Sequence, residues 1–105
     1  MRQRGMRLAL SILVFLSLAT LVQAKGDGKN GEKLAKQWCA TCHVVTPEQT
    51  TASADAPSFT SIAGNPLKSN DYLTGFLIDP HPPMPNLNLS RQEIADVIAY
   101  INSLN

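Results

Sequence analysis

The stretch Cys39-Ala40-Thr41-Cys42-His43 decides how the rest of this chain is interpreted. Two thiols three positions apart lie close together on a helical turn, so both can form thioethers with the two vinyl groups of one porphyrin. The imidazole of His43, on the next residue, is then delivered to the iron. Because each residue type has its own chemical task, the pattern is more specific than a bare pair of cysteines. It predicts one haem c, bound covalently through Cys39 and Cys42 and ligated by His43.

Three other interpretations of the two cysteines are weaker. A redox dithiol usually sits at a strand-to-helix junction, and no convincing strand flanks Cys39. A zinc site needs four ligands, and this chain would have to supply them from Cys39, Cys42, His43 and His81. The adjacent Cys42 and His43 would both have to bend onto one tetrahedral ion. A structural disulfide would close too small a loop to constrain the unfolded chain much.

Residues 1–24 have the layout of a secretory signal peptide. Three arginines form a positively charged head, residues 8–22 are largely apolar, and small residues precede the expected cut. We predict cleavage after Ala24, which leaves residues 25–105 as one domain in the periplasm. The alternative is a retained membrane anchor, for which an apolar run of 15 residues is short.

The remaining 81 residues are few for a self-sufficient core. A domain of this size buries only about 60 per cent of its unfolded surface, and a tethered macrocycle would complete the core. The mature chain carries six Lys and Arg against eight Asp and Glu, a net charge of minus two, which argues against nucleic acid as a partner. Four lysines are concentrated near the mature amino terminus: Lys25, Lys29, Lys33 and Lys36. They form a solvated helix face or, alternatively, a surface that orients a docking partner.

The first mature helix is expected to run from a cap at Asp27 or Asn30 to the haem motif. Its small and apolar residues share one face, since Gly31, Ala35 and Trp38 recur at i, i+4 and i+7. Two small residues one turn apart let another helix backbone approach closely. We expect that partner to be the last helix.

A loop and a short helix follow the haem motif. Residues 44–56 lack periodicity and are rich in Thr, Ser and Pro, which predicts a surface loop. Pro57 then opens a short helix that Gly64 closes. Phe59 and Ile62 are its expected buried pair.

Two further helices complete the chain. The first is capped by Ser69, Asn70 or Asp71 and ended by Pro80. Its apolar stripe consists of Tyr72, Leu73, Phe76 and Leu77.

The last helix has the clearest signals. Ser90 and Glu93 form a capping box, and Leu89 with Ile94 forms the matching hydrophobic staple. Tyr100 lies at the edge of an apolar stripe made of Ile94, Val97, Ile98, Ile101 and Leu104. The sequence therefore predicts an all-α fold.

The stretch His81-Pro82-Pro83-Met84-Pro85, which we name the strap, is the second informative segment. Three prolines in four positions make it extended and stiff. Outside the leader, Met84 is the only methionine. If a methionine thioether completes the coordination of the iron opposite His43, it must therefore be the thioether of Met84. The alternatives are a methionine that merely covers apolar surface, and ligation by His81, which we interpret instead as an exposed loop histidine.

With these segments in view, residues 27–104 resemble a small bacterial class I cytochrome c. The resemblance implies the cytochrome c fold, with three to four short helices around one covalently bound haem. In that family a glycine eight positions before the first cysteine packs against an aromatic residue of the last helix, which Gly31 and Tyr100 match. The resemblance also implies that the Pro57 carbonyl accepts a hydrogen bond from the far nitrogen of His43.

The chain departs from the family pattern at two points. Ala35 stands where the family often has an aromatic residue, so the helix crossing is open to a shift. The family's propionate-binding residues have no match here.

The predicted function is one-electron transfer in the periplasm. Iron held by His43 and Met84 has no vacant position for a substrate, so we predict no enzymatic activity. The chain is either a free carrier or a small subunit of a redox complex. Its partners would be a dehydrogenase, an oxidase or a cytochrome complex, and it would reach a membrane only through them or an uncleaved leader. The alternative is a haem sensor or peroxidase-like enzyme in which Met84 dissociates, although His81 is its only added distal acid–base group.

Overall fold

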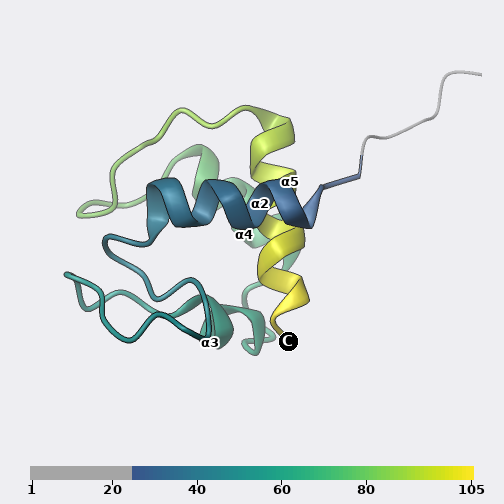
Figure 1. Ribbon diagram of the computed structural model, residues 1–105. Helices are drawn as coiled ribbons and strands as arrows, with labels where there is room; N and C mark the ends of the chain where they lie inside the picture. The colour runs from purple at the N-terminus through teal and green to yellow at the C-terminus, as the bar shows by residue number, and fades with distance from the viewer. Residues whose placement is uncertain (1–24) are drawn as a thin grey trace, which may run out of the picture.

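The computed structural model describes residues 25–105, so the predicted leader lies outside the described residues. The elements in chain order are α2 (Gly28–Leu34), the π-helix η2 (Ala35–Cys39), α3 (Phe59–Ala63), α4 (Asn70–Ile78) and α5 (Arg91–Ser103). Within residues 25–105 there is no strand. Figure 1 shows these short helices joined by long loops. The all-α prediction is confirmed.

The first helix changes character halfway along. The Asp27 side chain caps α2 by accepting hydrogen bonds from the backbone N–H groups of Lys29 and Asn30. After Leu34 the helix widens into η2, where the Ala40 N–H donates to the Ala35 carbonyl, five residues back. A π turn contains an extra residue, so the side chains after it leave the α-helical register.

The wide helical turn at η2 makes the prediction for Trp38 wrong. Trp38 was expected on the same buried face as Gly31 and Ala35. Ala35 is fully buried, whereas Trp38 is 54% exposed and lines the cavity between the haem motif and the strap. The physical reason is the change in helical period at η2, which the three-residue and four-residue spacing of the sequence does not reveal.

The helices α2 and α5 pack directly against each other, as expected, and cross steeply in Figure 1. A Cβ atom added at Gly31 would lie 1.9 Å from the Asp96 carbonyl oxygen and 2.9 Å from the Tyr100 Cβ. Because any side chain would separate the two helices, only glycine fits there. The pairing of Gly31 with Tyr100 that the family resemblance implied is present.

The last helix supplies most of the core. Its capping box is complete, since Ser90 Oγ accepts from the Glu93 N–H and Glu93 Oε1 accepts from the Ser90 N–H. Tyr100, at the edge of the apolar stripe, is only 5% exposed and is part of the core. Its hydroxyl donates a 2.6 Å hydrogen bond to the Val45 carbonyl. The buried side chains of the expected stripe are Ile94, Val97, Ile98 and Ile101.

The starts of α3 and α4 are set by serine caps. Ser58 Oγ accepts from the Ser61 N–H, so α3 begins one residue after the cap and not at Pro57 as predicted. Serine supplies a side-chain acceptor that proline lacks. Gly64 ends α3 as expected, and Ser69 caps α4 by accepting from the Tyr72 N–H.

The burial of two residues, Ile62 and Val45, differs from the prediction. Phe59 is buried, and Ile62 is partly buried, packs against the core and lines the cavity between the haem motif and the strap. Val45, in the predicted surface loop, is 1% exposed. Among the described residues, no helix combines the length and the apolar content needed to cross a bilayer.

Candidate haem site

A cavity of about 450 Å³ lies between the haem motif, α4 and the strap. This volume falls within the range of about 300–1,000 Å³ that is typical of cofactor sites. The cavity wall is mostly apolar, and Leu73 and Phe76 contribute to it from α4. The structure brings every site residue predicted from the sequence to this one cavity: Cys39, Cys42, His43, Pro57 and Met84.

The haem motif forms a tight turn at the end of η2. The backbone N–H groups of Cys42 and His43 both donate to the Cys39 carbonyl, at 3.2 and 2.9 Å. Both thiols are free and partly buried, so no disulfide is formed. Burial raises the pKa of the Cys39 thiol to about 11, with a smaller contribution from Cys42. The Cys39 thiol is therefore neutral at physiological pH.

His43 is oriented by a backbone carbonyl. Its Nδ1 atom lies 2.7 Å from the carbonyl oxygen of Pro57, and its ring packs against Phe59 with the ring centroids 5.6 Å apart. A carbonyl oxygen can only accept a hydrogen bond, so Nδ1 carries the hydrogen. The other ring nitrogen, Nε2, keeps a lone pair with which to bind a metal ion.

Gln49 ties the loop after the motif to the motif itself. Its Oε1 accepts from the Val45 N–H at 2.9 Å, while Nε2 donates to the carbonyls of Ala40 and His43 at 2.9 and 2.8 Å. The partly buried amide thereby replaces the regular backbone pairing that this loop lacks. Sequence reasoning missed Gln49, because a single glutamine in a Thr-rich loop carries no pattern.

The strap was predicted to be extended, but it forms a turn, in which the Met84 N–H donates to the His81 carbonyl at 3.0 Å. Met84 is partly buried, and His81 is exposed, as predicted. The His81 ring nevertheless contributes to the cavity wall and meets Phe76 edge-on, with the ring centroids 5.5 Å apart. Within residues 25–105 no three His, Cys, Asp or Glu side chains gather to hold a metal ion, so the four-ligand zinc arrangement is not formed.

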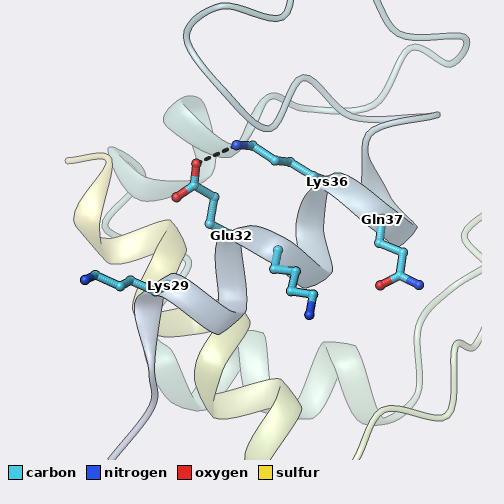
Figure 2. Close-up of a pocket in the computed structure, with 5 residues that line it drawn as sticks. Lys29, Glu32, Lys36 and Gln37 are labelled. Carbon is cyan, nitrogen blue, oxygen red and sulfur yellow. Dashed lines mark ion pairs between the residues drawn. The ribbon is translucent and has the colours of Figure 1, made fainter.

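The exposed side of α2 and η2 carries charged residues outside this cavity. Figure 2 shows Lys29, Glu32, Lys36 and Gln37 along it, around a shallow depression. Lys36 Nζ lies 2.8 Å from Glu32 Oε1, and both side chains are largely solvent-exposed. Such a pair adds little stability. The lysines of this segment are exposed.

The residues around the cavity fit a covalently attached porphyrin. Two thiols lie on one tight turn, an oriented imidazole follows them, and an apolar wall with one thioether completes the cavity. An all-α fold around such a site defines a c-type cytochrome.

Comparison with known proteins establishes the family. The family model described as cytochrome c oxidase, cbb3-type, subunit III matches residues 26–101. Cytochrome c-552 of Bradyrhizobium diazoefficiens is 48% identical over 101 residues, which cover 96% of this chain and 93% of that protein. No solved structure matches. The chain belongs to this family of c-type cytochromes and is an electron-transfer protein with covalently bound haem c, and its partners are redox proteins.

Proposed function

We propose that the chain carries single electrons in the periplasm on a haem attached through Cys39 and Cys42 and ligated by His43 and Met84. The observation that carries this proposal is the 2.7 Å contact between His43 Nδ1 and the Pro57 carbonyl oxygen. It leaves Nε2 available for iron on a residue that shares its cavity with both thiols and with Met84.

The haem, when bound, supplies an iron atom that changes between the ferric and ferrous states. The residues of this chain determine how readily it does so. The Pro57 carbonyl fixes the His43 ring and raises its basicity. A neutral thioether from Met84, together with the apolar cavity wall, disfavours the additional charge of the ferric state and therefore raises the potential.

Rigid loops on both sides of the cavity keep the two ligands in place. The prolines around Met84 restrict φ in the strap. On the other side, Gln49 binds the carbonyl of His43 itself. Small ligand movement between redox states keeps the reorganisation cost low, which suits electron transfer and argues for a carrier without enzymatic activity.

We also propose that residues 1–24 are a signal peptide cleaved after Ala24, and that residues 25–105 are the mature domain. The first residues of the proposed mature domain already contact α5. The Lys25 carbonyl accepts from Gln92 Nε2 at 3.1 Å, and a Cβ atom at Gly26 would lie 2.1 Å from the Ala95 carbonyl oxygen. Both contacts lie on the carboxyl side of the proposed cut, so cleavage after Ala24 leaves them intact. The mass of the protein recovered from the periplasm tests the boundary.

The partner that we propose is a dehydrogenase, an oxidase or a cytochrome complex, which this chain serves as a free carrier or as a small subunit. A free carrier should be recovered in the soluble periplasmic fraction, whereas a small subunit should be recovered from membranes in a complex. Membrane association is expected only through such a partner or an uncleaved leader.

The ligand set is tested by the ferric absorption spectrum of three holoproteins. The wild-type chain is expected to show the weak far-red charge-transfer band of a methionine–iron bond. Met84→Ala should lose this band, lower the potential and bind external ligands. His81→Ala, which changes the neighbouring candidate on the same strap, should keep the band. Loss of the band in His81→Ala and its retention in Met84→Ala would contradict the proposed ligation.

The attachment residues are tested by intact mass after denaturation. The wild-type chain should carry the mass of one haem, and the double variant Cys39→Ser, Cys42→Ser should have the mass of the bare polypeptide. A haem-sized mass that survives in the double variant would contradict the assignment of these two thiols.

A further inference from the structure

A single side chain, that of Gln49, binds three backbone groups in and just after the haem motif. Two of them belong to the ends of residues 43–45, which we name the ligand segment: the His43 carbonyl accepts from Nε2 at 2.8 Å, and the Val45 N–H donates to Oε1 at 2.9 Å. The third is the Ala40 carbonyl, which accepts from Nε2 at 2.9 Å. The ligand segment is therefore fastened at both ends, and to the motif, by one amide.

The Gln49 side chain has one orientation that satisfies these contacts. Its backbone N–H lies 3.2 Å from both the carbonyl oxygen and the Oγ1 atom of Thr46, so a turn aims the side chain. Nε2 also donates to the Thr51 carbonyl at 3.1 Å. With oxygen and nitrogen exchanged, the amide oxygen would face three carbonyls and the amide nitrogen would face an N–H group. The partly buried amide is thus fixed in place.

One further backbone bond extends this arrangement to the Pro57 carbonyl. The Phe59 N–H donates to the carbonyl of Val44, in the middle of the ligand segment, at 2.9 Å. The chain beside Pro57 is therefore attached to the same three residues that carry the imidazole. The 2.7 Å contact between His43 Nδ1 and the Pro57 carbonyl oxygen depends on the ligand segment keeping its position.

We propose that Gln49 is a positioning residue that sets the orientation of the His43 ring relative to the haem, an inference that rests on the proposed ligation by His43. Gln49 does not line the haem cavity, so it acts through the backbone of the ligand segment. When its hydrogen bonds are removed, the ring and the Pro57 carbonyl separate part of the time, and the ring occupies more than one orientation.

Another side chain of the same loop provides a matched control. Ser53 Oγ donates to the Thr41 carbonyl at 2.7 Å. This bond also joins the loop to the haem motif, but it does not involve the ligand segment. A general loosening of the loop should follow from either substitution, whereas a change in ring orientation should follow only from the loss of Gln49.

The test is the electron paramagnetic resonance spectrum of the frozen ferric holoprotein, because its g-values depend on the orientation of the axial imidazole plane. Wild type should show one set of g-values. Gln49→Leu, which has no hydrogen-bonding group and adds no sulfur, should show a second set or a broad distribution. Ser53→Ala should keep the wild-type values. Lower stability alone does not move the g-values of molecules that remain folded.

The exchange of the His43 Nδ1 hydrogen with solvent in the reduced holoprotein, followed by nuclear magnetic resonance, gives a second readout. It should be at least about tenfold faster in Gln49→Leu than in wild type, because the bond to Pro57 opens more often. Ser53→Ala should exchange at the wild-type rate.

A third measurement needs no variant, so it decides the matter even if Gln49→Leu does not fold. In wild type the Nε2 hydrogens of Gln49 should exchange more slowly than those of Gln37, which is exposed. Equal exchange at the two glutamines would overturn the inference. So would wild-type g-values and Nδ1 exchange in Gln49→Leu, or equal changes in Ser53→Ala. A wild-type haem iron without a histidine ligand would instead contradict the proposed function.

Discussion

The crossing of α2 with α5 and the haem cavity are built in opposite ways. At the crossing, Gly31 brings two backbones so close that no side chain fits between them. At the cavity, the haem motif, α4 and the strap enclose about 450 Å³. The polypeptide therefore completes one part of its core by itself and shapes the other part for a cofactor.

At the crossing of α2 and α5, both oxygens of the buried Asp96 carboxylate accept hydrogen bonds. Its carboxylate is 3% exposed and accepts hydrogen bonds from the Asp27 N–H at 2.7 Å, from Asn30 Nδ2 at 2.8 Å and from Gln92 Nε2 at 2.8 Å. Burial on its own raises the pKa of Asp96, but these three hydrogen bonds together outweigh it and hold the pKa below its ordinary value. The amino-terminal segment is thus attached to α5 through an ionised carboxylate.

The largest expected effect comes from removing the haem with the double variant Cys39→Ser, Cys42→Ser. Amides of α4 and the strap should then exchange hydrogen at nearly the rate of an unfolded chain, since their packing needs the cofactor. Amides of α2 and α5 should stay at least about tenfold better protected. Hydrogen exchange followed by mass spectrometry measures both. Equal loss of protection in the two regions would show that the crossing has no stability of its own.

Gly31→Ala should be the most damaging single substitution at the crossing. The added Cβ collides with the Asp96 carbonyl, so the helices must separate, at a cost of about 3 kcal/mol. Gly75→Ala is the matched control in α4, because a Cβ atom there would meet nothing within 4 Å. It should stabilise the protein by about 0.5–1 kcal/mol through helix propensity. Denaturant unfolding of both holoproteins gives the difference, and similar free energies of unfolding would mean that close contact at Gly31 is not required.

Asp96→Asn should cost about 2 kcal/mol, because one of its two acceptor oxygens becomes a donor that faces other donors. A carboxylate whose pKa is depressed in the folded state stabilises the protein above its unfolded pKa of about 4, and this stabilisation is lost as the pH falls through the folded pKa. Wild-type stability should therefore decrease below about pH 4, and Asp96→Asn should decrease less over the same interval. Unfolding curves at pH 7 and pH 3 measure this, and parallel losses in both proteins would contradict it.

Tyr100→Phe should have the smallest effect of this series, about 1 kcal/mol, because it removes one buried hydrogen bond and keeps the ring. The lost bond joins α5 to Val45, in the loop after the haem motif. The change should therefore affect both regions, with lower stability and faster hydrogen exchange around Val45. An exchange difference confined to α5 would show that this bond does not couple the two regions.

Much of the fold could be predicted from local sequence patterns. The capping box at Ser90, the cap at Asp27 and the small residues at Gly31 and Ala35 act over one or two helical turns, and each is found in the structure. The haem motif is likewise a local pattern. These features are readable because neighbouring residues decide them.

Other features depend on residues far apart in the chain. The burial of Asp96 needs donors from Asp27 and Asn30, more than sixty positions away. Gln49 and Val45 belong to a loop without periodicity, and their roles arise from carbonyls that only the folded motif presents. No local pattern marks any of these contacts.

The sequence by itself determined the chemistry of this protein, because covalent attachment of haem needs particular residue types at a fixed short spacing. It also determined the helices, since caps and apolar periodicity are local. Only the tertiary structure decided that Trp38 lines the cavity, that Asp96 is buried at the helix crossing, and that Lys68 and Tyr72 meet at the cavity wall. Those outcomes depend on a widened helical turn and on packing between distant segments, which spacing along the chain does not encode.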